Sequence, residues 1–112
     1  MVVYVPDRGD VVWLSFDPQV GREQAGRRPA LVLSPKDYNG KVGLLLCCPI
    51  TTRAKGYPFE VSIPAEAQVT GVILSDHVRS LDWRGRQAER ITHLPDETLR
   101  EVLDRIEALL RD

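Results

Sequence analysis

The residues of this sequence best suited to chemistry on a phosphate lie in two short segments. Arg27 and Arg28 stand together in EQAGRRPALVLSP, while Thr51, Thr52 and Lys55 stand together in TTRAKGYP. An arginine guanidinium is planar, always charged and able to hold a phosphate through two parallel N–H groups. Threonine hydroxyls can donate to phosphate oxygens, and a lysine ammonium acts as a point charge. The two segments favour an anion-binding site, although the same residues also fit an ordinary surface corner.

Aromatic and acidic side chains in the same regions extend this hypothesis. Phe16 and Tyr57, where exposed, offer faces on which unpaired bases stack. Phe16 fits a core position equally well, because it ends a predicted strand. Glu23 and Asp76 are carboxylates that can accept a base N–H or a proton. Together with the cations, these residues indicate a groove for single-stranded nucleic acid.

Metal-dependent and serine-nucleophile chemistry are not supported by the pattern. His77 and His93 are isolated in the sequence and lack the spacing of a zinc or two-metal site. Ser75, Asp76 and His77 are consecutive, but adjacency in sequence does not give the geometry of a catalytic triad, and no nucleophile elbow is present. We therefore expect no metal and no other cofactor.

Length and composition favour one domain over residues 1–112. Cys47 and Cys48 lie in the apolar run LLLCCPI, where free cysteines are commonly buried as small hydrophobic residues. The N-terminus lacks the pattern of a signal peptide, and no apolar run approaches the length of a membrane span. These features predict a cytoplasmic protein without a membrane partner.

The net charge of −1 conceals an uneven distribution along the chain. From Arg22 to Lys55 there are seven cations against two acids, whereas from Asp96 to Asp112 there are six acids against three arginines. A polyanionic partner requires clustered cations more than it requires a positive total. The distribution is consistent with nucleic-acid binding, although unevenly charged solvated surfaces are also common.

Short strands dominate the predicted structure. The segments bounded by turn residues are Asp10–Phe16, Pro29–Ser34, Val42–Ile50, Phe59–Ile63 and Gly71–Ser75, with RQAERITHL as a weaker sixth. The pair Asn39-Gly40 predicts a tight hairpin between the second and third of these strands. Several short strands in succession are typical of a compact antiparallel sheet or small barrel.

The second strand is expected to hold Arg28 in place. Ala30 to Leu33 is continuously apolar, which indicates a strand covered on both faces, and Pro29 opens it. The segment from Asp17 to Arg27 is longer than a hairpin requires, and loops of this length often carry function. Arg28 is therefore predicted at the rim of a packed strand, next to a long polar loop.

The C-terminal segment has the features of an amphipathic helix. Pro95 suits a first helical position, and Asp96 and Glu97 follow where the helix dipole favours acids. One apolar stripe at helical spacing comprises Leu99, Val102, Leu103, Ile106, Leu109 and Leu110. We expect this stripe to pack on the sheet as part of the core.

Four segments resemble the successive motifs of the MazF/PemK family of toxin endoribonucleases. They are PDRGDVVWLSFDP, GREQAGRRPALVLSP, CPITTRAKGYPFEV and LSDHVRSLDWRGR. The resemblance runs from Tyr4 to the C-terminal helix, in order and almost without gaps. It implies an α+β, β-rich fold, a small antiparallel SH3-like barrel with a C-terminal helix, formed as a homodimer.

The resemblance also implies an activity and a partner. Family members are toxins of type II toxin–antitoxin systems that cut single-stranded RNA, messenger RNA in particular, without metal. The 2′-hydroxyl attacks the phosphorus and leaves a 2′,3′-cyclic phosphate and a 5′-hydroxyl. A MazE-like antitoxin with an acidic, flexible tail covers the RNA groove. An alternative comes from toxins of the same fold that bind DNA gyrase without catalysis, because fold does not fix function.

Carried onto this sequence, the resemblance assigns the catalytic roles to Arg28 and Thr51. The RNA-binding residues that it implies are Phe16, Asp17, Glu23, Gln24, Arg27, Thr52, Lys55, Tyr57, Asp76 and His77. Some relatives use an aspartate corresponding to Asp76 as the base, but water, Glu23 or a perturbed arginine remain alternatives. His77 stands where the nearest relatives carry glutamine. The resemblance implies an ACA-containing cleavage motif. Histidine has a different pattern of donors and acceptors from glutamine, so His77 could change the motif that is recognised.

Overall fold

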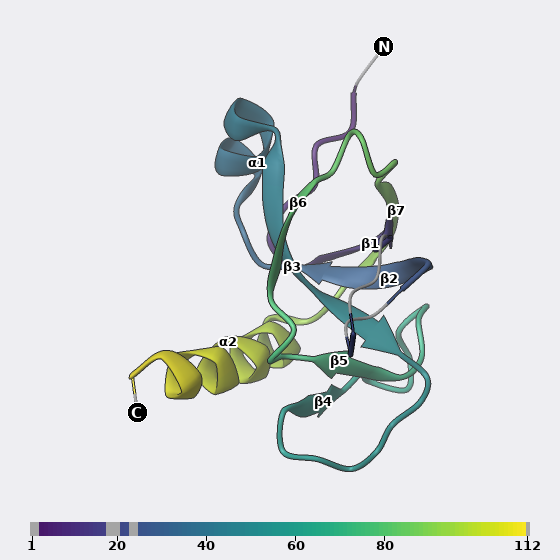
Figure 1. Ribbon diagram of the computed structural model, residues 1–112, viewed down its shortest axis with the longest axis vertical. Helices are drawn as coiled ribbons and strands as arrows, with labels where there is room; N and C mark the ends of the chain where they lie inside the picture. Colours follow the sequence, from purple (N-terminus) through teal and green to yellow (C-terminus); the bar gives the residue numbers. More distant parts are fainter. Residues whose placement is uncertain (1–2, 18–20, 23–24, 112) are drawn as a thin grey trace.

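The computed structural model describes residues 3–17, 21–22 and 25–111, and these residues form one antiparallel sheet with two helices (Figure 1). The elements are β1 (Asp10–Ser15), β2 (Arg27–Val32), α1 (Lys36–Val42), β3 (Leu44–Thr51), β4 (Glu60–Ser62), β5 (Val72–Leu74), β6 (Arg79–Asp82), β7 (Glu89–His93) and α2 (Asp96–Arg111). The strand order is β4-β5-β3-β2-β1-β7, with β6 paired to β3. The predicted small antiparallel fold with a C-terminal helix is confirmed.

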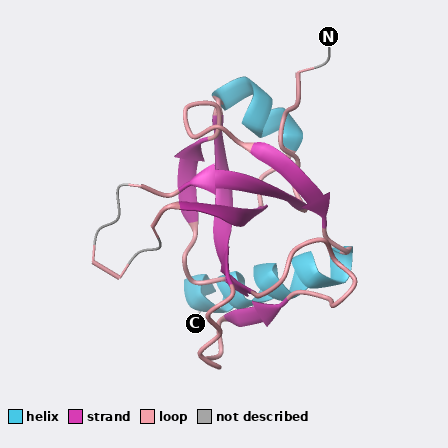
Figure 2. Cartoon of the chain, turned by 90° about the vertical axis from the view of Figure 1, so that its right-hand side faces the viewer, coloured by secondary structure: helices cyan, strands magenta, loops and turns pink. Residues whose placement is uncertain are grey.

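Strand β3 connects the two halves of the sheet. Its first part pairs with β2 and β6, and its last two residues pair with β5. The two helices lie toward opposite ends of the strands (Figure 2). Thr51, the last residue of β3, therefore lies where the two parts of the sheet meet.

Strand β2 is covered on both faces, as the sequence predicts. Leu31 belongs to one buried cluster with Val11, whereas Ala30 and Val32 belong to a second cluster on the other face. All three β2 residues have no exposed surface. Both cysteines are buried and free, as expected for small core residues. Arg28 is thus attached to one of the most firmly packed segments of the molecule.

The hairpin predicted at Asn39-Gly40 is wrong, because this pair lies inside α1. The positive φ expected of a turn glycine occurs instead at Gly43, which ends the helix. Asn39 is fully buried, and its side-chain nitrogen donates to the carbonyls of Pro6 and Ser34 at 2.7 and 3.0 Å. These hydrogen bonds, of which the one to Pro6 spans 33 residues, hold Asn39 in the helix and override its local preference for a turn.

Two strands differ from their predicted form. β6 is absent from the sequence-based prediction, because Leu81 is its only buried residue and an alternating pattern needs at least two. β2 begins at Arg27, so Pro29 lies inside the strand and does not open it. The missing N–H of Pro29 is tolerated because pairing with β3 starts at Ala30, one residue later.

The apolar stripe of α2 is only partly core. Leu99, Val102 and Ile106 pack against the buried cluster that contains Val11. Leu109 and Leu110 are 49% and 80% exposed, and the last turns of α2 extend past the strands (Figure 1). The prediction that the whole stripe is buried is therefore wrong. Neither this helix nor α1, the two helices within the described ranges, is long and apolar enough to span a bilayer.

A buried carboxylate ties the N-terminal segment to β7. Asp10 accepts a hydrogen bond from the hydroxyl of Tyr4 at 2.6 Å, lies 2.9 Å from Nδ1 of His93, and also accepts the N–H of Asp7. Arg90 approaches the same carboxylate at 3.9 Å. Burial alone would raise the pKa of Asp10, but the hydrogen bonds from Tyr4 and His93 outweigh it, and the pKa lies below its ordinary value.

This arrangement predicts a loss of stability in acid. Because the pKa of Asp10 is lower in the folded state, its contribution is complete above about pH 4, where an unfolded aspartate ionises. The contribution is lost as the pH falls through the lower folded-state pKa. We expect Asp10→Asn to be less stable at neutral pH and to lose less stability in acid, measured by thermal unfolding from pH 6 to pH 2. Glu66→Gln, on the exposed surface, should keep the wild-type profile; an identical acid loss in Asp10→Asn would contradict the prediction.

Candidate active site

Antiparallel register brings Arg28 and Thr51 opposite each other. β2 and β3 pair Ala30 with Pro49, and the register runs evenly through the next two pairs. Extended by two residues in the other direction, beyond the last paired residues, the same register would set Arg28 across from Thr51. Both side chains line the same two pockets. A cation and a hydroxyl thus lie close together on two strands that are buried in the core.

The Arg28 guanidinium is anchored on one side only. Its Nε donates to the carbonyl of Ala25 at 2.7 Å, which fixes the plane of the group. In the described part of the chain, no hydrogen bond or ion pair engages its two terminal nitrogens. These nitrogens carry the paired N–H groups that grip a phosphate. The side chain is therefore oriented and still available to an anion.

The Thr51 hydroxyl is buried and oriented by its own loop. Thr51 is 6% exposed, and its Oγ1 accepts the backbone N–H of Arg53 at 3.1 Å. Because this bond uses the hydroxyl oxygen only as an acceptor, the hydroxyl proton remains available for donation to a ligand in the pocket. Gly71 packs directly against the Thr51 backbone, where an added Cβ would lie 2.3 Å from the Thr51 carbonyl oxygen.

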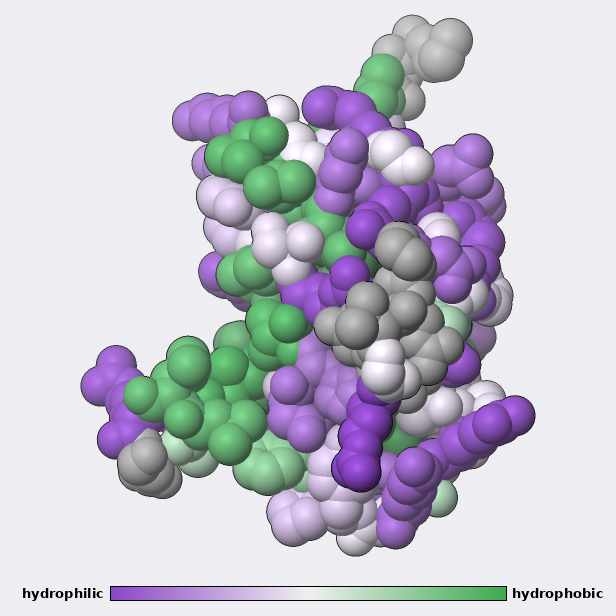
Figure 3. Space-filling view, in the orientation of Figure 1, coloured by the Kyte–Doolittle hydropathy of each residue, from purple (hydrophilic) through white to green (hydrophobic). Residues whose placement is uncertain are grey.

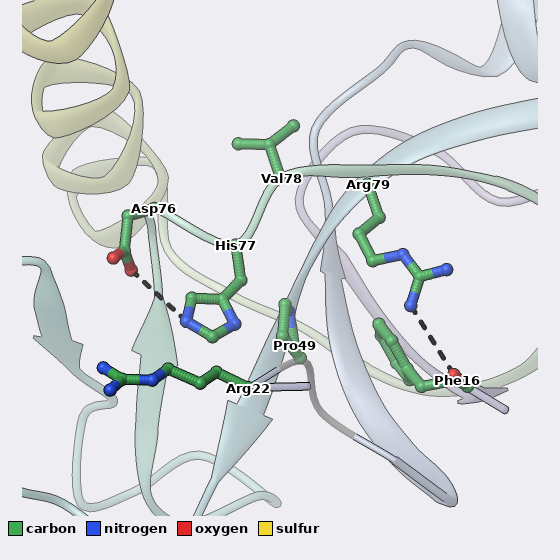
Figure 4. A pocket seen from close by; sticks show the side chains of 7 residues that line it. All are labelled: Phe16, Arg22, Pro49, Asp76, His77, Val78 and Arg79. Atoms are coloured by element: carbon green, nitrogen blue, oxygen red, sulfur yellow. Dashed lines mark hydrogen bonds and ion pairs between the residues drawn. The ribbon is translucent and has the colours of Figure 1, made fainter. Parts of the chain in front are cut away.

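Three adjoining pockets form one groove around Arg28 and Thr51. The central pocket, about 650 Å³, is lined by Arg22, Ala25, Arg28, Thr51, Arg53, Lys55, Tyr57, Glu60, Leu74, Asp76 and His77. The outer pocket, about 330 Å³, is lined by Phe16, Arg22, Pro49, Asp76, His77, Val78 and Arg79 (Figure 4). The threonine pocket, about 310 Å³, is lined by Ala25, Arg27, Arg28, Pro29, Ile50, Thr51, Thr52 and Thr70. The central pocket shares three residues with each neighbour, so the groove is continuous.

The central pocket is positively charged overall and also contains hydrogen-bond acceptors. Among the described residues that line it, four are cations and two are carboxylates. The Glu60 carboxylate is occupied, because it accepts the N–H groups of Lys55 and Gly56, each at 2.9 Å. Within the described ranges, no three His, Cys, Asp or Glu side chains form a group that could hold a metal ion. The arrangement suits a ligand that carries phosphates and polar bases.

Tyr57, Asp76 and His77 form a short polar chain between the central and outer pockets. The Tyr57 hydroxyl donates to Asp76 Oδ1 at 3.0 Å, and His77 Nε2 lies 3.9 Å from the same oxygen. Burial and the hydrogen bond to Asp76 raise the pKa of Tyr57 to about 12. Tyr57 therefore stays protonated at neutral pH and acts as a donor. Figure 4 shows His77 between Asp76 and Arg79, with its ring in the pocket.

A side chain of α2 holds the loop that carries Lys55 and Tyr57. Arg105 Nε donates to the carbonyl of Pro58 at 2.9 Å, and its guanidinium also pairs with Glu101 at 3.7 Å. Together with the Glu60 bonds to the backbone, this contact fixes a segment that has no regular secondary structure. The C-terminal helix thus supports one wall of the groove.

The RNA-binding residues inferred from resemblance fall into three groups. Thr52, Lys55, Tyr57, Asp76 and His77 line the groove with Arg28 and Thr51. Phe16 and Arg27 also line the groove, but they and Asp17 are engaged within the protein, as described below. Glu23 and Gln24 lie outside the described residues.

Phe16 does not meet the condition for base stacking. Its side chain belongs to the buried cluster around Leu14 and has no exposed surface, so the core alternative is the one observed. The Arg79 guanidinium lies 5.8 Å from the centre of the Phe16 ring and covers it further. The condition for stacking on Phe16 is therefore not met, although Phe16 still lines the outer pocket.

Asp17 and Arg27 act at the neck of the loop between β1 and β2. Asp17 Oδ1 accepts the N–H of Gly26 at 2.8 Å. The Arg27 guanidinium donates to the carbonyls of Arg86 and Gln87 at 3.3 and 2.7 Å and pairs with Glu89 at 3.2 Å. Their polar groups are therefore largely occupied by the protein, and their part in binding a ligand is indirect.

Several groove residues escape sequence reasoning. The pockets are also lined by Arg22, Arg53, Glu60, Thr70 and Arg79. In the sequence, the first two stand out only by their charge, and the other three have no feature that indicates function. Thr70 reaches Thr51 because β5 pairs antiparallel with the end of β3. A hydroxyl directly before a glycine was the available hint, since a glycine there allows close approach of two backbone segments.

Similarity to known proteins agrees with this fold. Residues 7–110 match the family of PemK-like, MazF-like toxins of type II toxin–antitoxin systems. The endoribonuclease toxin MazF of Escherichia coli K12 is 49% identical over 96% of both chains. A crystal structure of MazF from Deinococcus radiodurans superposes with a TM-score of 0.94 at 59% identity, covering 96% of this chain and 98% of the other. A MazE–MazF structure from the same organism has a TM-score of 0.88 at 59% identity, covering 96% and 97%.

The fold is thus that of a small toxin of the MazF type, and the groove is its candidate active site. The chain belongs to the PemK-like, MazF-like toxin family and is a MazF-type endoribonuclease of a type II toxin–antitoxin system.

Proposed function

We propose that this toxin cuts single-stranded RNA, including messenger RNA, in the cytoplasm at a short sequence motif and without a metal ion. The observation that carries the proposal is that Arg28 and Thr51 line the same two pockets of a continuous groove rich in cations. Both groups are fixed from behind, by Ala25 and by Arg53, with donor groups left for a ligand. This is the geometry expected for stabilising charge on a phosphate.

The proposed reaction is attack of the RNA 2′-hydroxyl on the adjacent phosphorus. A bond forms from the 2′-oxygen to phosphorus and the bond to the 5′-oxygen breaks, which yields a 2′,3′-cyclic phosphate and a 5′-hydroxyl. Negative charge grows on the non-bridging oxygens, where Arg28 and the Thr51 hydroxyl stabilise it. Donors held in place before the reaction cost no reorganisation during it.

Two protons must move in this reaction, one from the 2′-hydroxyl and one to the departing 5′-oxygen. An arginine is a poor acid or base because its pKa exceeds about 12. In the described part of the central pocket, Asp76 is the carboxylate not occupied by backbone N–H groups, since Glu60 accepts two of them. We assign Asp76, directly or through water, as the candidate base.

Recognition of the RNA sequence is assigned to the central and outer pockets. Lys55 and Thr52 contact the RNA backbone, Tyr57 donates and offers a ring face, and Asp76 and His77 face the bases. A base edge presents both donors and acceptors, so a pocket that reads it needs both kinds of group. We assign to His77 any preference for a motif other than ACA, because its donor pattern differs from that of glutamine.

A MazE-like antitoxin with an acidic tail is the proposed protein partner. The MazE–MazF structures of the Deinococcus relative support this pairing by similarity. The groove cations would attract an acidic segment as they attract RNA, so that the antitoxin competes with the substrate. Inhibition is therefore expected to weaken at high salt.

We also propose a homodimer, in which the exposed part of α2 packs against a second copy. Hydrophobic side chains gather along this helix (Figure 3), where Leu103, Leu109 and Leu110 are exposed. Leu103→Glu combined with Leu109→Glu should shift the protein toward monomer in analytical ultracentrifugation, because charges would be buried in the interface. Val3→Glu changes an exposed apolar residue near the N-terminus and should leave the mass unchanged. A wild-type monomer at micromolar concentration would refute the dimer.

The decisive experiment for the activity is cleavage of a long unstructured RNA in the presence of EDTA. The fragment ends would be sequenced and their chemistry determined. Discrete cuts with cyclic-phosphate and 5′-hydroxyl ends would establish the proposed reaction and identify its motif. Absence of cuts by folded, antitoxin-free protein would refute it and direct attention to a protein target such as DNA gyrase.

Binding of RNA in this groove should depend on salt. The affinity is expected to fall with a logarithmic slope of about −0.7 for each phosphate neutralised. Lys55→Ala should weaken RNA binding and make the slope less steep by about 0.7, the value for one phosphate. The rate at which the bound complex cleaves RNA should change little. The measurement is fluorescence anisotropy of a non-cleavable RNA across a salt series. A flat response would contradict the placement of the RNA.

A further inference from the structure

The threonine pocket adjoins the central pocket at Arg28 and Thr51. The two pockets share Arg28, Thr51 and Ala25, so the proposed reaction centre forms the ridge between them. A strand of RNA whose cut phosphate rests on this ridge extends into both pockets. The threonine pocket therefore receives the nucleotide on one side of the cut.

The chemistry of the threonine pocket differs from that of its neighbours. The central and outer pockets both contain Asp76 and His77, which supply acceptors as well as donors. Among the described residues that line the threonine pocket there is no carboxylate and no histidine; its polar side chains are arginines and threonines. Bases are read where donors and acceptors are mixed, whereas a phosphate is held where only donors and cations converge.

Thr70 is placed in this pocket by a close backbone contact. The next residue, Gly71, has a φ of +120° and lies against the backbone of Thr51 and Thr52. Because Gly71 has no Cβ, the two segments approach closely enough for Thr70 and Thr52 to line one pocket. Thr52 and Thr70 are both exposed, so their hydroxyls are accessible to a ligand.

Arg27 contributes less to this pocket than its charge suggests. Its guanidinium is engaged with Glu89 and with the carbonyls of Arg86 and Gln87. The direct donors that remain are the terminal nitrogens of Arg28 and the hydroxyls of Thr52 and Thr70. Thr52 and Thr70 line this pocket alone, whereas Arg28 also lines the central pocket. Of the two threonines, Thr70 is the one that lies outside the four segments that resemble the family motifs.

We propose that the threonine pocket binds the RNA phosphate next to the one that is cut, and that Thr70 donates a hydrogen bond to it. This assignment rests on the proposed function. It makes Thr70 a substrate-binding residue that fixes the register of the RNA on Arg28 and Thr51. The neighbouring phosphate is held without regard to sequence, while the bases on the other side of the cut are read.

The test uses a short RNA that contains the cleavage motif, with 2′-deoxyribose at the cut nucleotide so that it binds without reacting. A series of such RNAs carries one methylphosphonate, which removes the charge of a single phosphate. Thr70→Val should bind the unmodified RNA about tenfold more weakly, as expected for a lost hydrogen bond to a charged group. Thr92→Val, the same change on β7 outside the three pockets, should bind as the wild type does.

The series identifies the phosphate by a double-mutant cycle. For the RNA whose methylphosphonate lies next to the cut, the wild type and Thr70→Val should bind equally, because their shared interaction is already lost. An equal loss at every position, or no loss at all, would overturn the assignment. Cleavage of the all-ribose RNA by the wild type separates the two hypotheses. If the wild type cleaves while Thr70→Val binds normally, the pocket assignment fails and the proposed function stands.

Discussion

Replacing Arg28 by alanine is expected to slow RNA cleavage by at least a hundred- to a thousandfold, the usual effect of removing one preorganised transition-state donor. Arg28→Lys should recover little of the rate, because lysine keeps the charge but loses the two parallel N–H groups. Thr51→Val should also slow the reaction strongly, whereas Thr51→Ser keeps the hydroxyl and should retain much of the activity. The measurement is the single-turnover rate at saturating RNA.

The control for these variants is Arg53→Ala. Arg53 lines the central pocket and is exposed, so its loss should weaken RNA binding more than it slows the bound complex. All variants should unfold at temperatures close to that of the wild type. If Arg28→Ala lost affinity but kept the single-turnover rate, Arg28 would be a binding residue and the proposed chemistry would have to move elsewhere. A plain RNA-binding protein would show no change with Thr51→Val.

Gly71→Ala is expected to disable the site without removing any functional group. The new Cβ would lie 2.3 Å from the Thr51 carbonyl oxygen and 2.9 Å from its carbonyl carbon, distances at which the backbone must move. The φ of +120° adds strain for any residue with a side chain. A shift of about 1 Å in a catalytic group can cost about a hundredfold in rate. We expect a loss of that size together with a lower unfolding temperature.

The matched control for Gly71→Ala is Gly43→Ala. Gly43 also has a positive φ, of 82°, but its added Cβ would have Arg84 at 3.8 Å as its nearest contact, and it lies outside the three pockets. This variant should lose stability and, while folded, keep the wild-type cleavage rate. Equal rates for folded Gly71→Ala and the wild type would show that the Thr51 position tolerates movement. The comparison separates strain from misplacement of the hydroxyl.

The sequence by itself determined the parts of this protein that depend on local chemistry. An uninterrupted apolar run such as Ala30–Leu33 can be satisfied only between two covering layers, and the structure buries it in this way. Adjacent cysteines in an apolar run had to be core residues. The character of Arg28 and Thr51, a bidentate cation and a hydroxyl, is a property of the side chains. The helical spacing of the C-terminal stripe was likewise readable, and the helix begins at Asp96, one residue after the predicted first position at Pro95.

The tertiary structure decided which of these groups meet and which are already occupied. Arg28 and Thr51 face each other because of a strand register that no local pattern contains, and Gly71 reaches Thr51 through the pairing of β5 with β3. Arg27 looked equivalent to Arg28, yet carbonyls about sixty residues away occupy its guanidinium. Asn39 adopts a helix because it bonds to Pro6 and Ser34, against its preference for a turn. Residue type fixes what a side chain can do, but hydrogen-bond partners and burial come from distant segments, which only the folded chain brings together.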